Sequence, residues 1–183
     1  MKVREVVTYK GYFDEFFKQQ PQKVRDKIIK VLDIIEQIDR IPLTYLKYIE
    51  GTNGLFEVRV QLGNNIFRIF CFFDGNKLVV LLSGFQKKTQ KTPSEEIKRA
   101  ERLMTDYYIQ MNTKTLDQIK DEYYGEVGMP ERDRLERELV ALRIGFKIRS
   151  AREKLDLTQA ELASRIDKKR TFISKVENDG ENI

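Results

Sequence analysis

Arg59 and Arg68 lie in two segments, residues 55–62 and 66–73, whose residues follow the period of two that is typical of antiparallel strands. The Gly-Asn-Asn sequence at 63–65 between them predicts a tight hairpin turn. If its first two residues form the turn centre, the arginines lie directly opposite each other. If its last two do, the arginines are diagonal neighbours, and in both cases they share a face. Adjacent guanidinium groups repel unless an anion lies between them, and their planar fork suits phosphate oxygens, so we expect a phosphodiester site.

A basic run extends this face along the third strand of the expected meander. The same alternation places Lys87 with the two arginines, and the run continues through Lys88 to Lys91. Phe85 precedes it and supplies an aromatic edge. Cations with an aromatic neighbour are typical of surfaces that bind an RNA backbone and stack its bases, so we predict RNA contacts at Phe85 and Lys91.

Simpler interpretations exist for the same residues. Arg59 could pair with Glu57 or Glu50, and Arg68 could be solvated. Glu57 shares the arginine face and could act as a base or orient an arginine. Lys87 could transfer a proton if nearby cations lower its pKa, or it could serve only as a cation.

The composition narrows the possible chemistry. The 183 residues include 34 Lys and Arg, 29 Asp and Glu, one Cys and no His. The absence of histidine excludes imidazole acid/base catalysis, and a single cysteine excludes an internal disulfide or a multi-cysteine zinc site. We therefore expect no metal site and no cofactor. No apolar run is long enough to span a membrane, and the first residues lack the apolar stretch of a signal peptide, which predicts a cytoplasmic protein without membrane contact.

Several elements must position the arginine face. Residues 3–9 are predicted to form a strand, and residues 12–17 and 24–35 two amphipathic helices separated at Pro21. After the three-stranded meander, the Ser-Glu-Glu sequence at 94–96 predicts the start of another helix. The first part is therefore expected to have an α+β fold, with an antiparallel sheet packed on helices.

These segments resemble a known toxin family. Leu55–Arg59, Phe67–Phe70, Phe73–Lys77 and the Gly-Phe-Gln-Lys-Lys-Thr-Gln-Lys-Thr-Pro sequence at 84–93 are similar to the phage-derived HigB branch of the RelE-like toxins. The resemblance covers nearly all of residues 1–110. It implies a metal-independent endoribonuclease that cuts messenger RNA on the ribosome.

The resemblance also implies the site residues. Basic residues of the open sheet face and the following loop would carry cleavage, which corresponds here to Arg59, Arg68, Lys87 and Lys88. A ribose 2′-OH would attack the adjacent phosphate, and the arginines would stabilise the charge that develops. Some relatives add a C-terminal His or Tyr, and in this chain only Tyr107 or Tyr108 could correspond, on an expected helix.

The composition changes near residue 110. Residues 1–110 carry a net charge of +5 and most of the aromatic residues, whereas residues 111–183 are neutral overall. An acidic leader at 111–129, with an apolar face, could bind the toxin. From Pro130 a long helical pattern begins, and the basic end of the chain could bind DNA.

Residues 157–178 indicate a helix, a short turn and a second helix. Thr158 with Glu161 predicts a capping box, Ala163 is small where the helices must cross, and Ile166, Ile173 and Val176 are expected to supply the shared core. The pattern resembles the Xre, lambda-repressor-like helix-turn-helix family.

That resemblance implies a role for particular residues. Gln159 would anchor the DNA backbone, and the recognition helix would present Arg170, Thr171, Ser174 and Lys175 to the major groove. Asp167 occupies a turn position where glycine is usual. Because the family fold normally continues beyond this point, the domain at 130–183 is predicted to be truncated.

A HigB-like segment followed by an Xre-like segment matches the toxin-first order of HigBA systems, whose antitoxin is HigA. We predict a type II toxin-antitoxin complex in one chain, in which the antitoxin blocks the RNA face or ribosome entry and represses its operon. A natural fusion, an engineered fusion and two proteins numbered as one all fit. The expected partners are messenger RNA on the ribosome, the cognate toxin or antitoxin, operator DNA and further copies of the complex. The alternative is a DNA-binding transcriptional regulator with a non-catalytic N-terminal dimerisation or sensor domain.

Overall fold

The structure is a computed structural model that describes all residues except 1, 76–77, 88–93, 111–112 and 180–183; the side chains of residues 76–93 and 179 also lie outside the described part. The fold is mixed α+β, as predicted. By its internal contacts the chain divides after Tyr123 into two units, which are treated separately below. The elements in chain order are β1 (Glu5–Tyr9), α1 (Tyr12–Lys18), α2 (Gln22–Gln37), β2 (Leu46–Tyr48), β3 (Leu55–Leu62), β4 (Asn65–Asp74), β5 (Leu78–Lys87), α3 (Ser94–Gln110), β6 (Thr113–Thr115), α4 (Leu116–Tyr124), α5 (Pro130–Lys154), α6 (Gln159–Arg165) and α7 (Arg170–Asp179).

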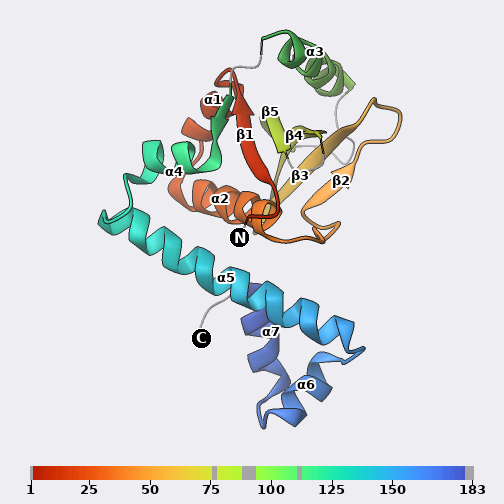
Figure 1. Cartoon of the computed structure of the whole chain (residues 1–183), viewed down its shortest axis with the longest axis vertical. Helices are drawn as coiled ribbons and strands as arrows, with labels where there is room; N and C mark the ends of the chain where they lie inside the picture. The colour runs from red at the N-terminus through yellow and green to blue at the C-terminus, as the bar shows by residue number, and fades with distance from the viewer. Residues whose placement is uncertain (1, 76–77, 88–93, 111–112, 180–183) are drawn as a thin grey trace. The chain divides into compact units, whose positions relative to one another are not determined.

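The first unit is built on a six-stranded sheet with the order β2-β3-β4-β5-β1-β6 (Figure 1). The predicted meander forms its centre as β3, β4 and β5. The first strand, β1, runs parallel to β5, and the three-residue strands β2 and β6 close the two edges in antiparallel orientation. Neither edge strand was predicted from the sequence.

The hairpin between β3 and β4 sets the register of the arginines. Leu62 pairs with Asn65, so the turn consists of two residues, and its first residue, Gly63, has a φ of 57°. A positive φ at this position favours glycine in a two-residue hairpin turn. Of the two registers considered, the structure has the one in which Arg59 and Arg68 are direct partners.

Helices cover both faces of the sheet. Phe16 of α1 packs against Phe67 of β4, with 6.5 Å between ring centroids, on the face that also receives α2. On the opposite face, Ala100, Leu103 and Tyr107 of α3 pack with residues of β1, β3 and β4, namely Val7, Tyr9, Leu55, Phe70 and Phe72. Because Leu55 and Phe70 alternate in phase with Arg59 and Arg68, α3 lies on the arginine face, towards one end of the strands.

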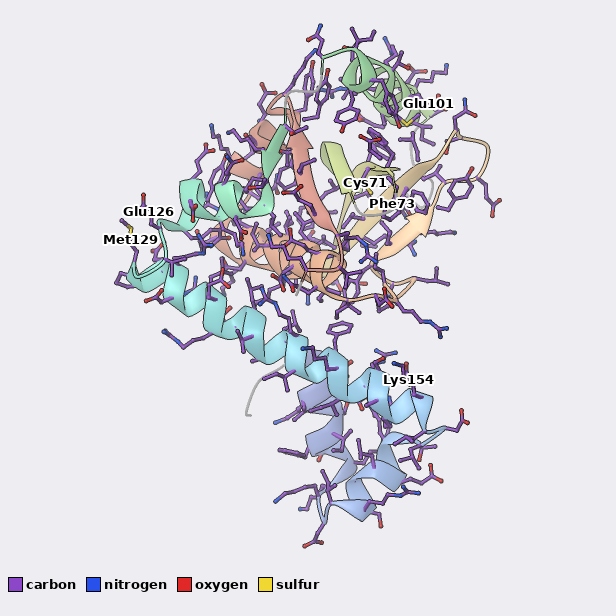
Figure 2. All side chains as sticks on the ribbon, viewed as in Figure 1. Cys71, Phe73, Glu101, Glu126, Met129 and Lys154 are labelled. Atoms are coloured by element: carbon purple, nitrogen blue, oxygen red, sulfur yellow. The ribbon has the colours of Figure 1, made fainter. Side chains whose placement is uncertain are left out.

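Burial excludes the single cysteine as a nucleophile. Cys71 lies on β4 and is fully buried, and this burial raises the pKa of its thiol (Figure 2). A raised pKa disfavours the reactive thiolate, so Cys71 serves the core.

The segment that follows α3 packs onto the first unit. In β6, Lys114 pairs with Thr8 of β1, and in α4 Leu116 and Ile119 are fully buried. The ring of Tyr123 lies edge-on to Phe17 of α1, with a centroid distance of 4.8 Å. Composition places a boundary near residue 110, whereas contacts place it after Tyr123.

The regular elements of the second unit are all helices over its described residues, 124–179. As predicted, α5 begins at Pro130, and α7 packs against it where Gly145 faces the carbonyl oxygen of Val176. A Cβ on Gly145 would lie 2.0 Å from that oxygen, so only glycine allows this approach. Within the described residues, no helix has both the length and the apolar character that a membrane span requires.

Helices α6 and α7 form the predicted helix-turn-helix. Ala163, Ile173 and Val176 are buried as expected. The prediction for Ile166 was wrong, since its side chain is 47% exposed at the C-cap of α6. Asp167 has a φ of 50° in the following turn, the conformation for which glycine is usual and which Asp tolerates better than most residues.

Candidate functional site

Arg59 and Arg68 are joined by a carboxylate. Glu57, two residues before Arg59 on β3, lies on the same face. Its Oε1 is 3.1 Å from Nε of Arg59, and its Oε2 accepts a hydrogen bond from Nη1 of Arg68. The anion between the two guanidinium groups is therefore a side chain of the protein. Pairing of Arg59 with Glu57 is the simpler alternative considered for that residue.

The two arginines differ in accessibility. The side chain of Arg59 is 36% exposed, whereas that of Arg68 is 7% exposed, so the suggestion that Arg68 is solvated was wrong. Burial lowers the pKa of Arg68, although a guanidinium remains charged. Arg59 can thus meet a ligand at the surface, while Arg68 and Glu57 form its buried support.

The third strand brings the next predicted residues to this place by register. Phe85 pairs with Arg68, and Lys87 pairs with Ile66. A register shift between Phe70 and Cys71 leaves Leu81 opposite Cys71, so the alternation predicted for β5 does not continue to that residue. The side chains of Phe85 and Lys87, and the whole of Lys88 and Lys91, lie outside the described residues.

The tyrosines at the end of α3 do not join the arginines. Tyr107 is buried and donates a hydrogen bond to Asp74 with a distance of 2.8 Å. Burial and the Asp74 carboxylate raise the pKa of its hydroxyl. Asp74 is six residues from Arg68 along β4, which corresponds to about 20 Å at the rise of a strand. Tyr107 therefore holds α3 to the sheet, and Tyr108 contacts Phe72 beside it.

A further cation shares the face and was not foreseen. Lys47 of β2 is exposed, and in the register of β2 and β3 it lies directly opposite Glu57. The strand has only three residues and no period that could identify it, so the sequence alone gives no signal for this placement.

Two lysine bridges connect β6 and α4 to the rest of the first unit. Nζ of Lys114 lies 2.7 Å from Oδ2 of Asp14 in α1 and 2.8 Å from Oε2 of Glu122 in α4. Nζ of Lys2 likewise lies 2.7 Å from Oδ2 of Asp117 in α4 and 3.1 Å from Oε2 of Glu36 in α2.

The two acids that contact Lys2 have pKa values shifted in opposite directions. Burial opposes ionisation of Asp117, yet hydrogen bonds from Lys120 and Lys2 lower its pKa to about 2. Glu36 is fully buried, and this burial raises its pKa despite the contact with Lys2.

A buried ion pair anchors the helix-turn-helix to α5. Arg152 contacts both carboxylate oxygens of Glu177 at 2.6 and 2.8 Å, and Gln159 donates to Glu177 at 2.9 Å. Burial disfavours the charged carboxylate, but these hydrogen bonds hold the pKa of Glu177 below its usual value. Thr158 and Glu161 form the predicted capping box at the start of α6. The amide of Gln159, predicted to anchor DNA, therefore also holds Glu177.

The two faces of α7 differ in character. Ile173, Val176 and Glu177 are buried. Of the residues predicted to read DNA, Arg170, Thr171 and Lys175 are exposed and Ser174 is half-buried, where Asn178 hydrogen-bonds to it at 3.3 Å. Lys168 and Lys169, which the sequence analysis did not select, are also exposed in the turn before α7. The helix therefore presents a polar, basic face.

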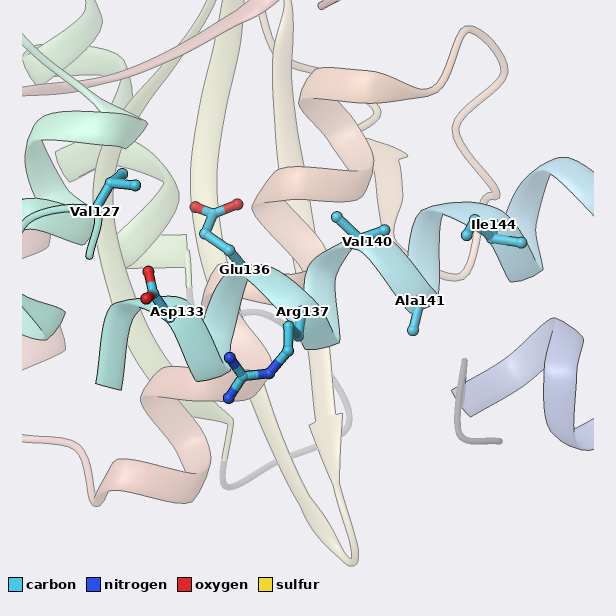
Figure 3. Close-up of a pocket in the computed structure, with 7 residues that line it drawn as sticks. All are labelled: Val127, Asp133, Glu136, Arg137, Val140, Ala141 and Ile144. Carbon is cyan, nitrogen blue, oxygen red and sulfur yellow. The ribbon is translucent and has the colours of Figure 1, made fainter. Parts of the chain in front are cut away.

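A surface pocket along α5 does not have the character of a reaction site (Figure 3). Val140, Ala141 and Ile144 supply its apolar part. Its carboxylates serve local contacts, because Asp133 accepts from the backbone amide of Gly128 and Glu136 pairs with an arginine of the same helix. Within the described ranges, no cluster of three or more His, Cys, Asp or Glu side chains could hold a metal ion.

Comparison with known families assigns two parts of the chain. Residues 15–105 match the family described as "Phage derived protein Gp49-like (DUF891)", which is part of the RelE-like toxin superfamily. Residues 148–183 match a helix-turn-helix family. No curated protein matches the sequence. The chain therefore joins a Gp49-like domain, which contains the Glu57-Arg59-Arg68 cluster, to a DNA-binding helix-turn-helix domain.

Proposed function

We propose that the chain is a toxin and its antitoxin in one polypeptide. The Gp49-like domain is an endoribonuclease that cuts messenger RNA on the ribosome, in the manner of the HigB toxins. The remaining residues act as a HigA-like antitoxin that neutralises the toxin and represses its operon, so both activities belong to the cytoplasm. The observation that carries the proposal is the direct pairing of Arg59 and Arg68 on one sheet face of a Gp49-like domain.

The roles of the two arginines follow from their exposure. Arg59 contacts the scissile phosphate, because its guanidinium is partly exposed. Arg68 adds positive charge from its buried position, and Glu57 fixes both side chains. The oxygen of the ribose 2′-OH attacks the phosphorus and releases its proton to solvent, and the bond to the 5′-oxygen breaks as that oxygen takes up a proton from solvent. The arginines stabilise the charge on the pentacoordinate phosphorus. This task is electrostatic and requires no imidazole and no metal.

Residues at the end of β5 and directly after it complete the site in this proposal. Lys87 and Lys88 supply further cations, and the backbone pairing of Lys87 with Ile66, in phase with Arg68 on β4, supports this role for Lys87. Phe85 and Lys91 contact the RNA on either side. These roles rest on the resemblance and on the register of β5.

Neutralisation uses the segment that contains β6 and α4. The acidic leader predicted at 111–129 begins with this segment, and its described contacts are with β1, with α1 and with Lys2, which also pairs with Glu36 of α2. Strand β6 lies three strands from β4, about 14 Å at the usual spacing between strands, so this strand does not cover the arginines. Between the two mechanisms considered, this favours obstruction of ribosome entry over direct occupation of the RNA face.

Repression uses the domain predicted at 130–183. Arg170, Thr171, Ser174 and Lys175 of α7 read base edges in the major groove of the operator, and Gln159 contacts the phosphate backbone. A second copy of the complex occupies the other half of an inverted repeat, since helix-turn-helix proteins commonly read two half-sites as dimers.

A growth assay tests the toxin assignment. We expect residues 1–110 to arrest growth when expressed alone, the full chain to be tolerated, and Arg59→Ala to relieve arrest by the short chain. Arg99→Ala is the matched control, because Arg99 is an exposed arginine on α3. Equal arrest by the short and full chains would reject neutralisation. Undiminished arrest by Arg59→Ala at equal protein levels would reject the arginine site.

One observation favours the alternative of a regulator with a non-catalytic N-terminal domain. Glu57 already neutralises part of the charge of the arginines, as a purely structural ion-pair cluster would. In that case no form of residues 1–110 arrests growth, while the full chain still binds its operator.

A further inference from the structure

Lys47 belongs to the arginine face by its register. In the pairing of β2 with β3, Leu46 lies opposite Val58, and Lys47 lies opposite Glu57. Directly paired residues of antiparallel strands point to the same side of a sheet. Leu46 and Val58 are buried, whereas Lys47 is exposed. The alternation along this short strand thus turns its apolar residue to the core and its lysine to the face of Arg59.

The charge on this face exceeds what Glu57 can balance. Glu57 pairs with both Arg59 and Arg68, and Lys47 adds a third cation beside the same carboxylate. Among the described residues, Lys47 makes no hydrogen bond or ion pair, so its ammonium group is available to a ligand. Three cations around one carboxylate leave a net positive charge, which favours an anion with more than one negative group.

The spacing suits a chain of phosphates. Lys47 and Arg59 are diagonal neighbours on adjacent strands, a relationship that puts Cα atoms about 7 to 8 Å apart. Arg68 lies on the next strand in the same direction. The cations therefore form a row that crosses β2, β3 and β4, and the step from Lys47 to Arg59 is comparable to the distance between successive phosphates of a single strand.

We propose that Lys47 binds the phosphate next to the one held by Arg59, so that single-stranded RNA crosses the sheet from β2 towards β5. This inference rests on the proposed function and extends it to a second phosphate subsite. Lys47 is a binding residue that does not touch the reacting atoms. Its loss weakens RNA binding.

The test is binding of a 2′-O-methyl oligoribonucleotide, which cannot be cleaved, to the full chain over a range of salt concentrations. We expect Lys47→Ala to weaken binding roughly tenfold at low salt, the change for one lost charge-assisted contact. The slope of log K against log salt should fall by about 0.7, the value for one phosphate of a single strand. Lys47→Arg should keep the wild-type slope. Lys23→Ala is the matched control, since Lys23 is an exposed lysine on α2, which covers the opposite face, and it should change neither quantity.

Arg59→Ala, measured in parallel, separates the two possible failures. If Arg59→Ala weakens binding and Lys47→Ala does not, the second subsite is refuted and the proposed function stands. If neither changes binding, the proposed RNA face itself is refuted. If Lys47→Ala acts and Arg59→Ala does not, the shared row of cations is refuted. Any contribution of the helix-turn-helix domain to RNA binding is common to all variants and cancels in the comparison.

Discussion

The guanidinium group of Arg68 and the carboxylate of Glu57 form an ion pair in which neither side chain is more than 7% exposed. Without Arg68, the buried charge of Glu57 loses its buried partner and is compensated less completely, by the partly exposed Arg59. We therefore expect Arg68→Ala to lower the free energy of unfolding of the first unit by about 3 to 5 kcal/mol. Urea denaturation measures this change. Glu57→Leu with Arg68→Met should restore much of the loss, and a double variant no more stable than Arg68→Ala would contradict this explanation.

Arg59→Ala is expected to separate function from stability. Its side chain is partly exposed and contacts Glu57 through Nε alone among the described contacts, so its loss should cost less than about 1 kcal/mol. Growth arrest should nevertheless disappear if Arg59 meets the phosphate. The free energy of unfolding and the growth arrest, both measured for Arg59→Ala, distinguish a role in activity from a role in stability. A loss of activity that tracks a loss of folded protein would assign Arg59 a structural role only.

The packing of α4 can be weakened from within its apolar face. Leu116 is fully buried, and Leu116→Ala should cost about 2 to 5 kcal/mol. Hydrogen exchange at the amides of β6 should accelerate, and under the proposed function the full chain should become toxic. Glu126→Ala, at an exposed position, is the control (Figure 2). Accelerated exchange without toxicity would show that the β6-α4 segment does not neutralise the toxin.

Acid should destabilise the helical unit through Glu177. The pKa of Glu177 in the folded protein lies below its ordinary value of 4.5, because Arg152 and Gln159 stabilise the charged form against its burial. The stabilisation that the charged Glu177 provides is fully present above its ordinary pKa. It is lost as the pH falls through the lower pKa of the folded state, since the unfolded state binds the proton first. Hydrogen exchange at α7 should report the loss between about pH 6 and pH 3. Glu177→Gln should be less stable at neutral pH and should lack this part of the pH dependence.

The crossing of α5 and α7 depends on Gly145. Gly145→Ala would put a Cβ against the backbone oxygen of Val176, so the helices must separate, at a cost of about 1 to 3 kcal/mol. Operator binding should weaken because α7 moves relative to its support. Ser150→Ala on the exposed side of α5 is the control. A Gly145→Ala protein with unchanged thermal unfolding would show that the crossing tolerates a side chain.

The sequence predicted those features that depend on neighbours along the chain. The period of β3 and β4 with the turn at 63–65 predicted that Arg59 and Arg68 share a face in one of two registers, and the structure has the register in which they pair directly. The capping box at Thr158 and the start of α5 at Pro130 were likewise local and were confirmed.

The features that the sequence did not reveal depend on distant partners. Strands β2 and β6 have three residues each and exist only because a longer strand lies beside them. The register shift at Phe70 and Cys71 could not be read from alternation, because the apolar residues of β5 run without a polar break. The burial of Arg68 depends on tertiary packing, and so does the exposure of Ile166, which a helical period alone assigned to the core.

The position of β6 in the chain has a kinetic and thermodynamic consequence. Because β6 belongs to the same polypeptide as β1, its docking is a unimolecular equilibrium governed by an effective local concentration. Dilution, changes in expression level and competition from other copies therefore leave the bound fraction unchanged. Only local unfolding of β6 and α4, or scission of the chain, can separate this segment from the sheet that it completes.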